Sequence, residues 1–425
     1  MNSLLLSQVS PSNKVLYGIL LLFGVVFLVF DPNATGDLGL YCEAARALFD
    51  GKDIYHERFS DCSCLQYLSS PFWALSLTSL AYLPGAIGAW LWKLIQLFLL
   101  LGIWQNCIFL LNIDLTRSKR SVLFTFLVFL STSFLIYANF HFVQFTIFLL
   151  FLMLGSLRSS QERKPVKAGI LLAVGIMVKL LPLVLIPYFI YRKDFKTVLY
   201  TLLFVASFLL IPAFFIGWEQ NIGLLESWFF FMDPSRVEFS LEMGSRTEHG
   251  LGTLITSLLI ADTGATNSLP IRNLVDLHPQ IVYRIVLIGK LTLVAGTFFF
   301  LRGKPFTWEA SKPNIMWVSS YILIVAALIF PLMQHYSFLL MFPAIFYLLA
   351  GQFDLRKRQK AEESAIWRFL LIVAFLFVNA ELFLGQFREI YWHYKTMTYG
   401  ALIIIALLYF ASPTKNDELT EEPSS

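Results

Sequence analysis

Long apolar runs without charge alternate along the chain with short polar segments. No Asp, Glu, Lys or Arg occurs in the runs 65–92, 94–113, 121–157, 197–218 and 313–353. A membrane-spanning helix needs about 20 mainly apolar residues. The two longest runs, 121–157 and 313–353, are therefore each predicted to hold two helices. This pattern predicts an all-α, polytopic membrane protein with about 10–12 transmembrane helices.

The composition supports this interpretation. The 425 residues are 57% hydrophobic and 14% charged, whereas soluble domains average about 45–50% apolar and about 25% charged residues. Outer-membrane barrels show short alternating segments instead of long apolar runs. The composition therefore argues against a soluble enzyme, a nucleic-acid-binding protein and an outer-membrane barrel.

The distribution of charge predicts the topology. Five short loops, 112–121, 158–167, 191–196, 302–313 and 352–368, hold 18 of the 32 Lys and Arg residues. By the positive-inside rule, these loops face the cytoplasm. Two longer segments are acidic: 31–65 has seven acids against three bases, and 218–280 has eight against three. Both acidic segments are predicted to form outer loops.

Ten crossings follow from this assignment. The predicted spans are 15–30, 87–111, 122–138, 141–157, 197–217, 281–301, 314–331, 335–350, 368–385 and 396–411. No small-residue cleavage site follows the first span, so it is interpreted as an uncleaved anchor. Residues 1–411 are predicted to form one integral-membrane domain, and the polar residues 412–425 a disordered cytoplasmic tail.

Two apolar segments do not fit a simple crossing. Residues 168–190 have the length of one helix, yet basic loops flank them on both sides, and Lys179-Leu-Leu-Pro182 interrupts them. A proline inside a helix removes a hydrogen bond and forces a kink. We therefore expect two short helices that enter the membrane from the cytoplasm and return. Residues 66–83 have the same parity problem, and either re-enter the membrane or lie along its outer face.

The first outer segment contains a short amphipathic helix. Leu38, Tyr41, Ala45 and Leu48 recur at helical spacing, and Gly51 is a plausible end signal. Asp37 stands at the start of this helix. From the residues alone, Asp37 is either an N-cap that accepts backbone N–H bonds or a reactive carboxylate at the outer membrane face.

The six histidines test the topology, because it was drawn without them. His56, His141, His249, His278, His335 and His393 all fall in or beside predicted outer loops and turns. Either histidine simply prefers the interface, or a polar cavity opens on the outer side.

Several motifs, in chain order, resemble those of one enzyme family. They are Asp37, Tyr41, Ala44, Ala45, Gly51 and Tyr55; Ser70-Pro71-Phe72-Trp73-Ala74-Leu75 through Leu83-Pro84; Leu91-Trp92; Val143-Gln144-Phe145-Thr146; Ala168-Gly169 through Lys179-Leu180-Leu181-Pro182; and Pro331-Leu332-Met333-Gln334-His335-Tyr336. Together they resemble the polyprenol-phosphate-sugar-dependent glycosyltransferases of the C superfamily, in the bacterial branch of α-mannosyl- and arabinofuranosyltransferases. The chain departs from that family at Gln144, which lacks the usual Gly before it and Asn after it, and near Ser69, where a Tyr is expected. These departures leave the sugar and the acceptor open.

The resemblance implies a reaction. The family's donor is a sugar, mannose in many members, linked through phosphate to a long isoprenoid and presented at the outer leaflet of the plasma membrane, and the acceptor is a lipid or a glycan. The cytoplasmic loops are too short for a nucleotide-binding domain, and neither G-x-G-x-x-G nor a P-loop occurs. The family places its catalytic Asp in the first outer loop, which favours Asp37 as general base over the N-cap interpretation. Asp31 and Glu43 are the alternatives.

The leaving phosphate requires fixed cations or hydrogen-bond donors. Lys179, Arg246, His249 and His335 are the candidates for binding the donor phosphate. A lysine inside the membrane is functional by default, although it can also extend to the interface. Tyr41, Gln144 and Gln334 are candidates for binding the sugar or acceptor, with helix packing as the alternative for Gln144.

Other chemistry and other functions have less support. Histidine and cysteine spacing does not indicate a metal site, and no cofactor or nucleic-acid partner is predicted. Cys42 could form a disulfide bond with Cys62 or Cys64, or all three could be free thiols. A secondary transporter or a lipid flippase is the alternative function, but transporters usually repeat a helix interruption in both halves. Here the interruption at 179–182 has no counterpart.

Overall fold

The computed structural model describes residues 11–30, 35–59, 65–115, 119–232, 241, 247–261, 269–301, 306 and 311–413. Over these residues the secondary structure is helical, apart from two isolated β-bridges, Phe59–Leu65 and Glu248–Gln334. The predicted all-α class is confirmed. Most of the predicted tail lies outside the described residues, so the division into a domain at 1–411 and a tail stays a prediction.

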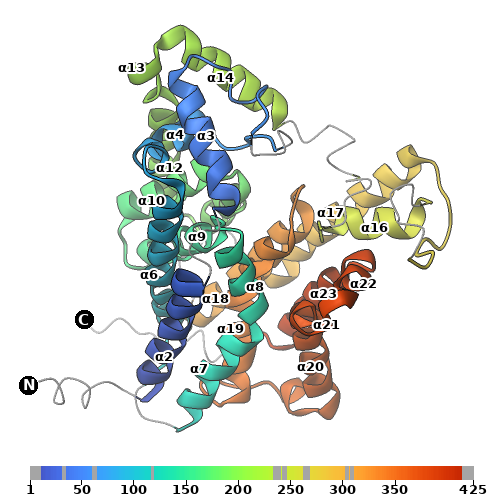
Figure 1. Cartoon of the computed structure of the whole chain (residues 1–425). Helices are drawn as coiled ribbons and strands as arrows, with labels where there is room; N and C mark the ends of the chain where they lie inside the picture. The colour runs from blue at the N-terminus through green and yellow to red at the C-terminus, as the bar shows by residue number, and fades with distance from the viewer. Residues whose placement is uncertain are drawn as a thin grey trace, which may run out of the picture.

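The helices follow one another in Figure 1 as the apolar runs predict. The N-terminal half contains α2 (Pro11–Val25), η1 (Val26–Phe30), α3 (Gly36–Phe49), α4 (Pro71–Ser76), α5 (Thr78–Ala81), α6 (Gly85–Leu111), α7 (Lys119–Ser131), α8 (Ser133–His141), α9 (Thr146–Gln161), α10 (Pro165–Val178), η2 (Leu181–Val184), α11 (Leu185–Tyr191), α12 (Phe195–Leu210) and α13 (Ala213–Ile216). The remainder contains α14 (Trp218–Phe231), α16 (Leu251–Leu259), α17 (Pro279–Phe300), α18 (Lys312–Ile329), η3 (His335–Met341), α19 (Phe342–Gln352), η4 (Lys360–Glu363), α20 (Ala365–Asn379), α21 (Glu381–Leu384), η5 (Gly385–Phe387), α22 (Arg388–His393) and α23 (Thr396–Phe410).

Several helices are long and apolar enough to cross a membrane. In the described part of the chain, five pass by length and composition: Pro11–Phe30, Gly85–Leu111, Phe195–Ile216, Pro279–Phe300 and Lys312–Ile329. Two further pairs, α7 with α8 and α20 with α21–α22, would each make one span bent by 52° and 60°. The protein is therefore a polytopic membrane protein. Shorter apolar helices fill the remaining predicted crossings.

Side chains bond to backbone groups at the bend between α7 and α8. Thr132, between α7 and α8, bonds through Oγ1 to the carbonyl of Val128 at 2.9 Å, and such bonds often bend helices. Asn379, the last residue of α20, accepts a bond from the N–H of Phe134 at 3.2 Å and donates one to the carbonyl of Ser131 at 2.9 Å. The side chain of the last residue of α20 therefore satisfies backbone groups at the break between α7 and α8, as a membrane interior requires.

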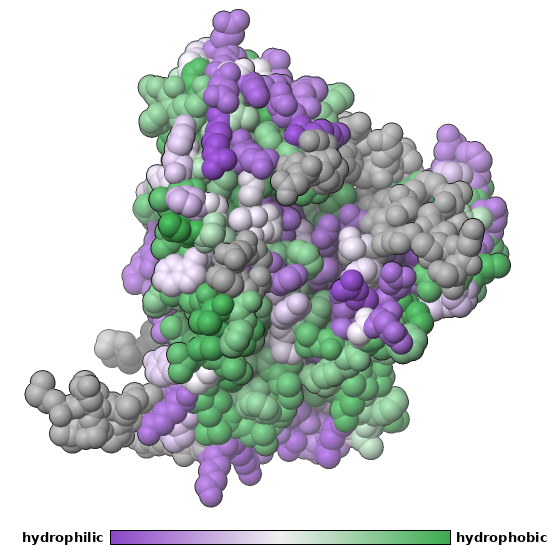
Figure 2. All heavy atoms as spheres, in the orientation of Figure 1, coloured by the Kyte–Doolittle hydropathy of each residue, from purple (hydrophilic) through white to green (hydrophobic). Residues whose placement is uncertain are grey.

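The helices differ in what they face. Large apolar side chains on α2, α12 and α17, such as Leu21, Leu202 and Phe298, are exposed. In Figure 2 hydrophobic residues cover much of the lower half of the molecule, and hydrophilic ones gather at the upper end, where α3 and α14 lie, and at the lower rim. This is the surface expected of a protein that faces lipid.

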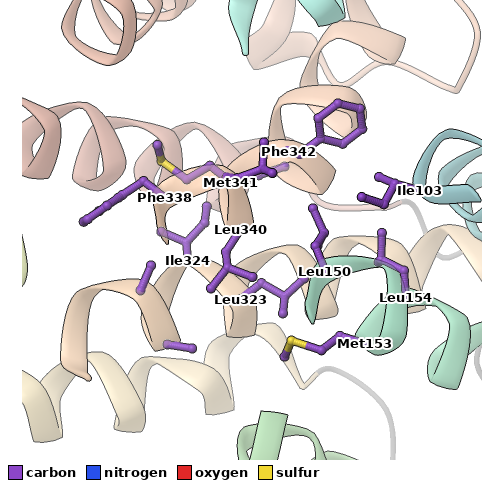
Figure 3. Close-up of a cluster of buried hydrophobic side chains, with 14 of the residues drawn as sticks. Ile103, Leu150, Met153, Leu154, Leu323, Ile324, Phe338, Leu340, Met341 and Phe342 are labelled. Atoms are coloured by element: carbon purple, nitrogen blue, oxygen red, sulfur yellow. The ribbon is translucent and has the colours of Figure 1, made fainter. Parts of the chain in front are cut away.

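A central core lies behind this surface. Nearly all of α18 and α19 is buried. Figure 3 shows residues of α6, α9, α18, η3 and α19 packed together, among them Ile103, Leu150, Leu323 and Phe342. This core fixes the ends of α8, α9 and α18 that lead into the candidate site.

The five basic loops meet at one end of the molecule. The hydrogen bonds that join the loops or their flanking residues are Arg120–Asp354, Ser160–Asp194, Tyr191–Leu301 and Lys312–Asn112. The two acidic segments meet elsewhere: Ser227 donates to Asp53 at 2.6 Å, and Gln220 donates to the carbonyl of Leu48 at 2.9 Å. The grouping predicted from charge is therefore present in the structure.

The hairpin predicted for residues 168–190 is also present. Helix α10 ends at Val178, Lys179 is extended, and η2 and α11 follow. Ser160, at the end of α9, donates to Asp194, between α11 and α12, at 2.5 Å. The residues that precede and follow the hairpin therefore lie next to each other. Residues 66–83 form only α4 and α5, which pack against α3 and are too short to cross.

Gly169 allows α10 to approach α12 closely. A Cβ atom at Gly169 would lie 2.6 Å from Cβ of Tyr200 and 2.8 Å from the backbone N of Thr201. Because the nearest atoms belong largely to backbone, Gly169→Ala must push the two helices apart. Overpacking of this kind costs about 1–3 kcal/mol.

We expect a lower Tm for purified Gly169→Ala in detergent. Gly223→Ala on α14, where nothing lies within 4 Å, is the control and should leave Tm unchanged; equal Tm values for both variants would contradict the close approach.

Candidate active site

The start of α3 is fixed against the turn between α8 and α9. Gly36 has a φ of +49°, and a Cβ atom there would collide with the backbone carbonyl of Phe142. The N–H of Asp37 donates to that same carbonyl at 3.0 Å. Helix α3 begins at Gly36 with Thr35 as its N-cap residue. Asp37 is therefore not the N-cap, and its carboxylate is available for other contacts.

Gln144 makes one of those contacts. Its Nε2 donates to Oδ2 of Asp37 at 2.6 Å. The backbone carbonyl of Gln144 accepts bonds from Trp92 Nε1 at 3.2 Å and from Gln96 Nε2 at 2.7 Å. Val143, just before it, has a φ of +49°, so the turn is strained as well as anchored. Two residues of α6 therefore hold the backbone of Gln144, whose side chain bonds to Asp37.

Lys179 is a cation whose charge acts on the Asp37 carboxylate. It follows the last residue of α10, is half-buried and interacts electrostatically with the Asp37 carboxylate. Burial raises the pKa of Asp37, while the bond from Gln144 and the charge of Lys179 oppose that rise; the net direction is upward. A carboxylate with a raised pKa is a stronger base than an exposed one.

Aromatic hydroxyls surround the same carboxylate. The Tyr41 ring packs edge-on against Phe145, with ring centroids 4.6 Å apart, and against Tyr67 at 5.5 Å. Burial and the nearby Asp37 raise the pKa of Tyr41 to about 12, so its hydroxyl stays neutral. Tyr336, at the start of η3, also interacts electrostatically with Asp37.

A second polar cluster lies between the segment before α16, η3 and the start of α23. The N–H of His249 donates to the carbonyl of Met333 at 2.9 Å. Lys395 Nζ donates to the carbonyl of Glu248 at 2.9 Å, and Thr398 Oγ1 donates to that of His249 at 2.6 Å. These bonds fix the short segment 248–249 to two different parts of the chain.

The His249 imidazole is available for a ligand. It is fully buried, and neither ring nitrogen has a hydrogen-bond partner. Burial, with the nearby Lys395 and His335, holds the pKa of His249 well below its usual value. A buried polar group without a partner is costly, and two further basic side chains stand beside this one. An anion could therefore bind here.

Tyr336 connects the two clusters. Its hydroxyl interacts electrostatically with Asp37 and Tyr41 of the first cluster and with Glu248 of the second. The carboxylate with its lysine and the histidines with their lysine therefore lie near one common residue. Such an arrangement suits a reaction in which a proton is removed at one place and negative charge develops at another.

The structure brings most of the predicted residues together. Asp37, Tyr41, Gln144 and Lys179 form the first cluster, and His249, Gln334 and His335 belong to the second. Arg246, Asp31, Cys62 and Cys64 lie outside the described residues. Cys42 is a free thiol.

Glu43, the other alternative for the base, is placed differently. It lines a cavity of about 230 Å³ between α3, α5 and the start of α6, together with Cys42 and Arg46 but without Asp37. Within the described residues no group of three or more His, Cys, Asp and Glu side chains could hold a metal ion.

Four site residues were missed from the sequence: Gly36, Gln96, Tyr336 and Lys395. Gly36 directly precedes Asp37, and a glycine before a reactive residue is a signal for an unusual backbone conformation. Lys395 lies at the start of the last apolar helix, is 1% exposed and has a φ of +54°. A lysine at such a boundary looks like an ordinary interfacial charge, so no pattern in the sequence separates it from one.

A family model and the all-α membrane fold together define an integral-membrane glycosyltransferase of the GT-C type. The family model described as Glycosyltransferase family 87 matches residues 67–331, more than half of the chain, so the protein belongs to that family. The matched region contains Gln144, Lys179 and His249, while Asp37 precedes it and His335 follows it. A comparison with curated proteins finds no match.

Removing the Gln144 amide should change how the enzyme responds to pH. Gln144→Leu loses the bond that lowers the pKa of Asp37, so that pKa rises. With Asp37 as the hypothesised general base, which cannot accept a proton once it is protonated, glycosyl transfer should fail at a higher pH than in the wild type while remaining near normal at alkaline pH. Rates measured from pH 5 to 9 test this. Gln220→Leu, which removes an interhelical bond to Leu48, should leave the pH profile unchanged; the same profile for Gln144→Leu and wild type would refute the coupling.

Proposed function

We propose that the protein transfers a sugar, mannose in the first instance, from a polyprenyl-phosphate donor to a lipid or glycan acceptor at the outer face of the plasma membrane. The observation that carries this proposal is the Asp37 carboxylate, bonded to Gln144 at 2.6 Å and facing Lys179, in a glycosyltransferase family 87 chain. It supplies a base and a cation at the end of the molecule where the acidic segments meet.

Asp37 acts as the general base. It takes the proton of the acceptor hydroxyl while that oxygen attacks the anomeric carbon. The bond from the anomeric carbon to the phosphate oxygen breaks, and polyprenyl phosphate leaves with the electron pair. Attack from the face opposite the leaving group inverts the configuration at the anomeric carbon. The raised pKa of Asp37 suits this task, since a base is most effective when its pKa approaches the working pH.

Fixed basic groups stabilise the leaving phosphate. Lys179 interacts electrostatically with Asp37, and His249 with His335. Tyr336 interacts both with Asp37 and with Glu248, the residue before His249. Arg246 is a further candidate in the same outer loop. Groups already in place where negative charge develops need no reorganisation during the reaction, which makes them effective. Tyr41 and Gln334 are proposed to contact the sugar or the acceptor.

A lipid-linked donor fits the remaining geometry. The basic loops are short and joined to one another, and the described parts of these loops form no domain that could hold a nucleotide. The candidate site is built instead from α3, the broken hairpin and η3. A donor whose isoprenoid chain stays in the bilayer can bring its sugar to such a site from the side.

Replacing the base without changing its shape tests the proposal. Asp37→Asn keeps the size of the side chain but cannot accept the proton. We expect mannose transfer from polyprenyl-phosphate-mannose to membrane lipid acceptors to fall by about 10²–10⁴-fold, with Tm and expression near wild type. Glu43→Gln, which alters the neighbouring carboxylate, should retain activity. Wild-type turnover in Asp37→Asn would exclude this mechanism, and lipid scrambling or solute uptake that survives the substitution would favour a flippase or a transporter.

The orientation of the site can be tested by labelling. Glu219 on α14 and Lys360 on η4 are both exposed and lie beside the acidic and the basic segments respectively. In a chain whose four cysteines are replaced by serine, we expect Glu219→Cys to react with an impermeant maleimide in intact cells. Lys360→Cys should react only after permeabilisation. The reverse pattern would place the site on the cytoplasmic side.

A further inference from the structure

Helix α10 ends inside the molecule, and two serines satisfy its end. Ser70 Oγ donates to the carbonyl of Met177 at 2.7 Å, and Ser70 N–H reaches the same carbonyl at 3.1 Å. Ser69 Oγ donates to the carbonyl of Val178 at 2.7 Å. The last carbonyls of a helix have no partner within it, so these bonds replace the turn that would have followed.

One of these serines, Ser69, is also bonded to the helix that carries Asp37. The side chain of Ser69 is hydrogen-bonded to the hydroxyl of Tyr41, one turn after Asp37 on α3. Hydroxyl groups of Tyr55 and Tyr67 donate to the carbonyls of Ser69 and Ser70 at 2.7 Å and 2.8 Å. Ser69 and Ser70 are 2% and 0% exposed. Bonds therefore hold this pair in place from both sides.

Lys179 directly follows the end of α10 to which the two serines are bonded. It follows Val178 directly and has φ and ψ of −156° and 140°, so the backbone is already extended at the lysine. The direction of its side chain therefore depends on the end of α10: Pro182 cannot continue the helix, and Ser69 and Ser70 hold the carbonyls at its end in place. Neither serine forms a hydrogen bond with the Asp37 side chain.

We propose that Ser69 and Ser70 are positioning residues that set the separation between the Asp37 carboxylate and the Lys179 ammonium, by joining α3 to the end of α10. The inference rests on the proposed function, in which Asp37 is the base and Lys179 a cation of the site. It explains the Ser-Ser-Pro sequence at the start of α4. The two serines bond to the end of α10, and Pro71 occupies the first position of α4.

The test compares Ser69→Ala/Ser70→Ala with a matched control. Ser364 also accepts a backbone bond three residues on, from Trp367 at 3.1 Å, and donates to a carbonyl, of Ala361, at 2.8 Å. Ser70 does the same with Trp73 at 3.2 Å and Met177. Ser364→Ala therefore reproduces the loss of a helix cap far from the site.

The first measurement needs no donor. Carbodiimides modify a carboxyl group only when it is protonated, so the pH dependence of Asp37 labelling, read by mass spectrometry, follows its protonation. The groups that face Asp37 are Lys179 from α10, Gln144 from the α8–α9 turn, Tyr41 from its own helix and Tyr336 from η3. If the serines hold Lys179 near Asp37, the double variant weakens the charge that lowers the pKa of Asp37. Labelling should then persist to higher pH in the double variant, and Ser364→Ala should match the wild type; an unshifted double variant would overturn the proposal.

The second measurement asks whether the serines act through Lys179. In a Lys179→Met background the charge is already absent, so adding Ser69→Ala/Ser70→Ala should produce no further shift in labelling. Residues that share one interaction are non-additive in this way. A full further shift in that background would assign the serines a merely structural role and overturn the inference. The single variant Ser70→Thr keeps the hydroxyl group and should therefore show the same labelling profile as the wild type.

Turnover of polyprenyl-phosphate-mannose separates this inference from the proposed function. We expect the double variant to lose roughly tenfold in kcat, as about 1.4 kcal/mol of lost stabilisation would give, with its acidic limb moved to higher pH. If Asp37→Asn is active, the proposed function fails, whatever the serine variants show. If Asp37→Asn is inactive while the double variant keeps the wild-type kcat and labelling profile, the inference alone fails.

Discussion

The break in the hairpin after Val178 is the constraint on which the site depends. Inside a membrane protein no water replaces the hydrogen bonds that an interrupted helix loses, so broken backbone survives only where other groups satisfy it. Here the hydroxyls of Ser69 and Ser70 donate to the last carbonyls of α10, and the bond between Ser69 and Tyr41 connects this helix end to the helix that carries Asp37. The polar groups that repair the fold are the neighbours of the groups proposed to carry the chemistry.

The Asp37 carboxylate stands between two opposing effects. Burial favours its protonated form, whereas the Gln144 amide and the Lys179 charge favour the ionised form. Burial alone would leave the carboxylate protonated and unable to act as a base. Exposure with strong ion pairing would leave it ionised but weakly basic. The arrangement around Asp37 lies between these limits, and each opposing group comes from a different part of the chain.

The sequence predicted the features that depend on local pattern. Apolar runs located the helices, the distribution of Lys and Arg grouped the loops correctly, and Lys179-Leu-Leu-Pro182 between two basic loops predicted the hairpin. The contacts of the site are long-range. Gln144 lies 107 residues from Asp37, and Ser69 lies 109 residues from Val178. No periodicity encodes such pairs, so the resemblance to a family gathered Asp37, Gln144 and Lys179 into one site but gave neither their bonds nor the role of Gly36.

Lys395 explains why the sequence predicted only the histidines and Gln334 of the second cluster. His249 was predicted as a phosphate ligand because of its outer loop and His335 because its turn resembles one of the family, but two buried neutral imidazoles hold an anion weakly. Lys395 lies beside His249 with its Nζ bonded to the carbonyl of Glu248. Burial and the Lys395 charge together keep His249 neutral, and in the proposed function that charge attracts the phosphate. A neutral imidazole can donate one N–H to a phosphate without adding a second buried charge, whose desolvation would cost several kcal/mol. One lysine with hydrogen-bonding histidines is therefore a less costly way to bind an anion in a buried site than a group of three cations.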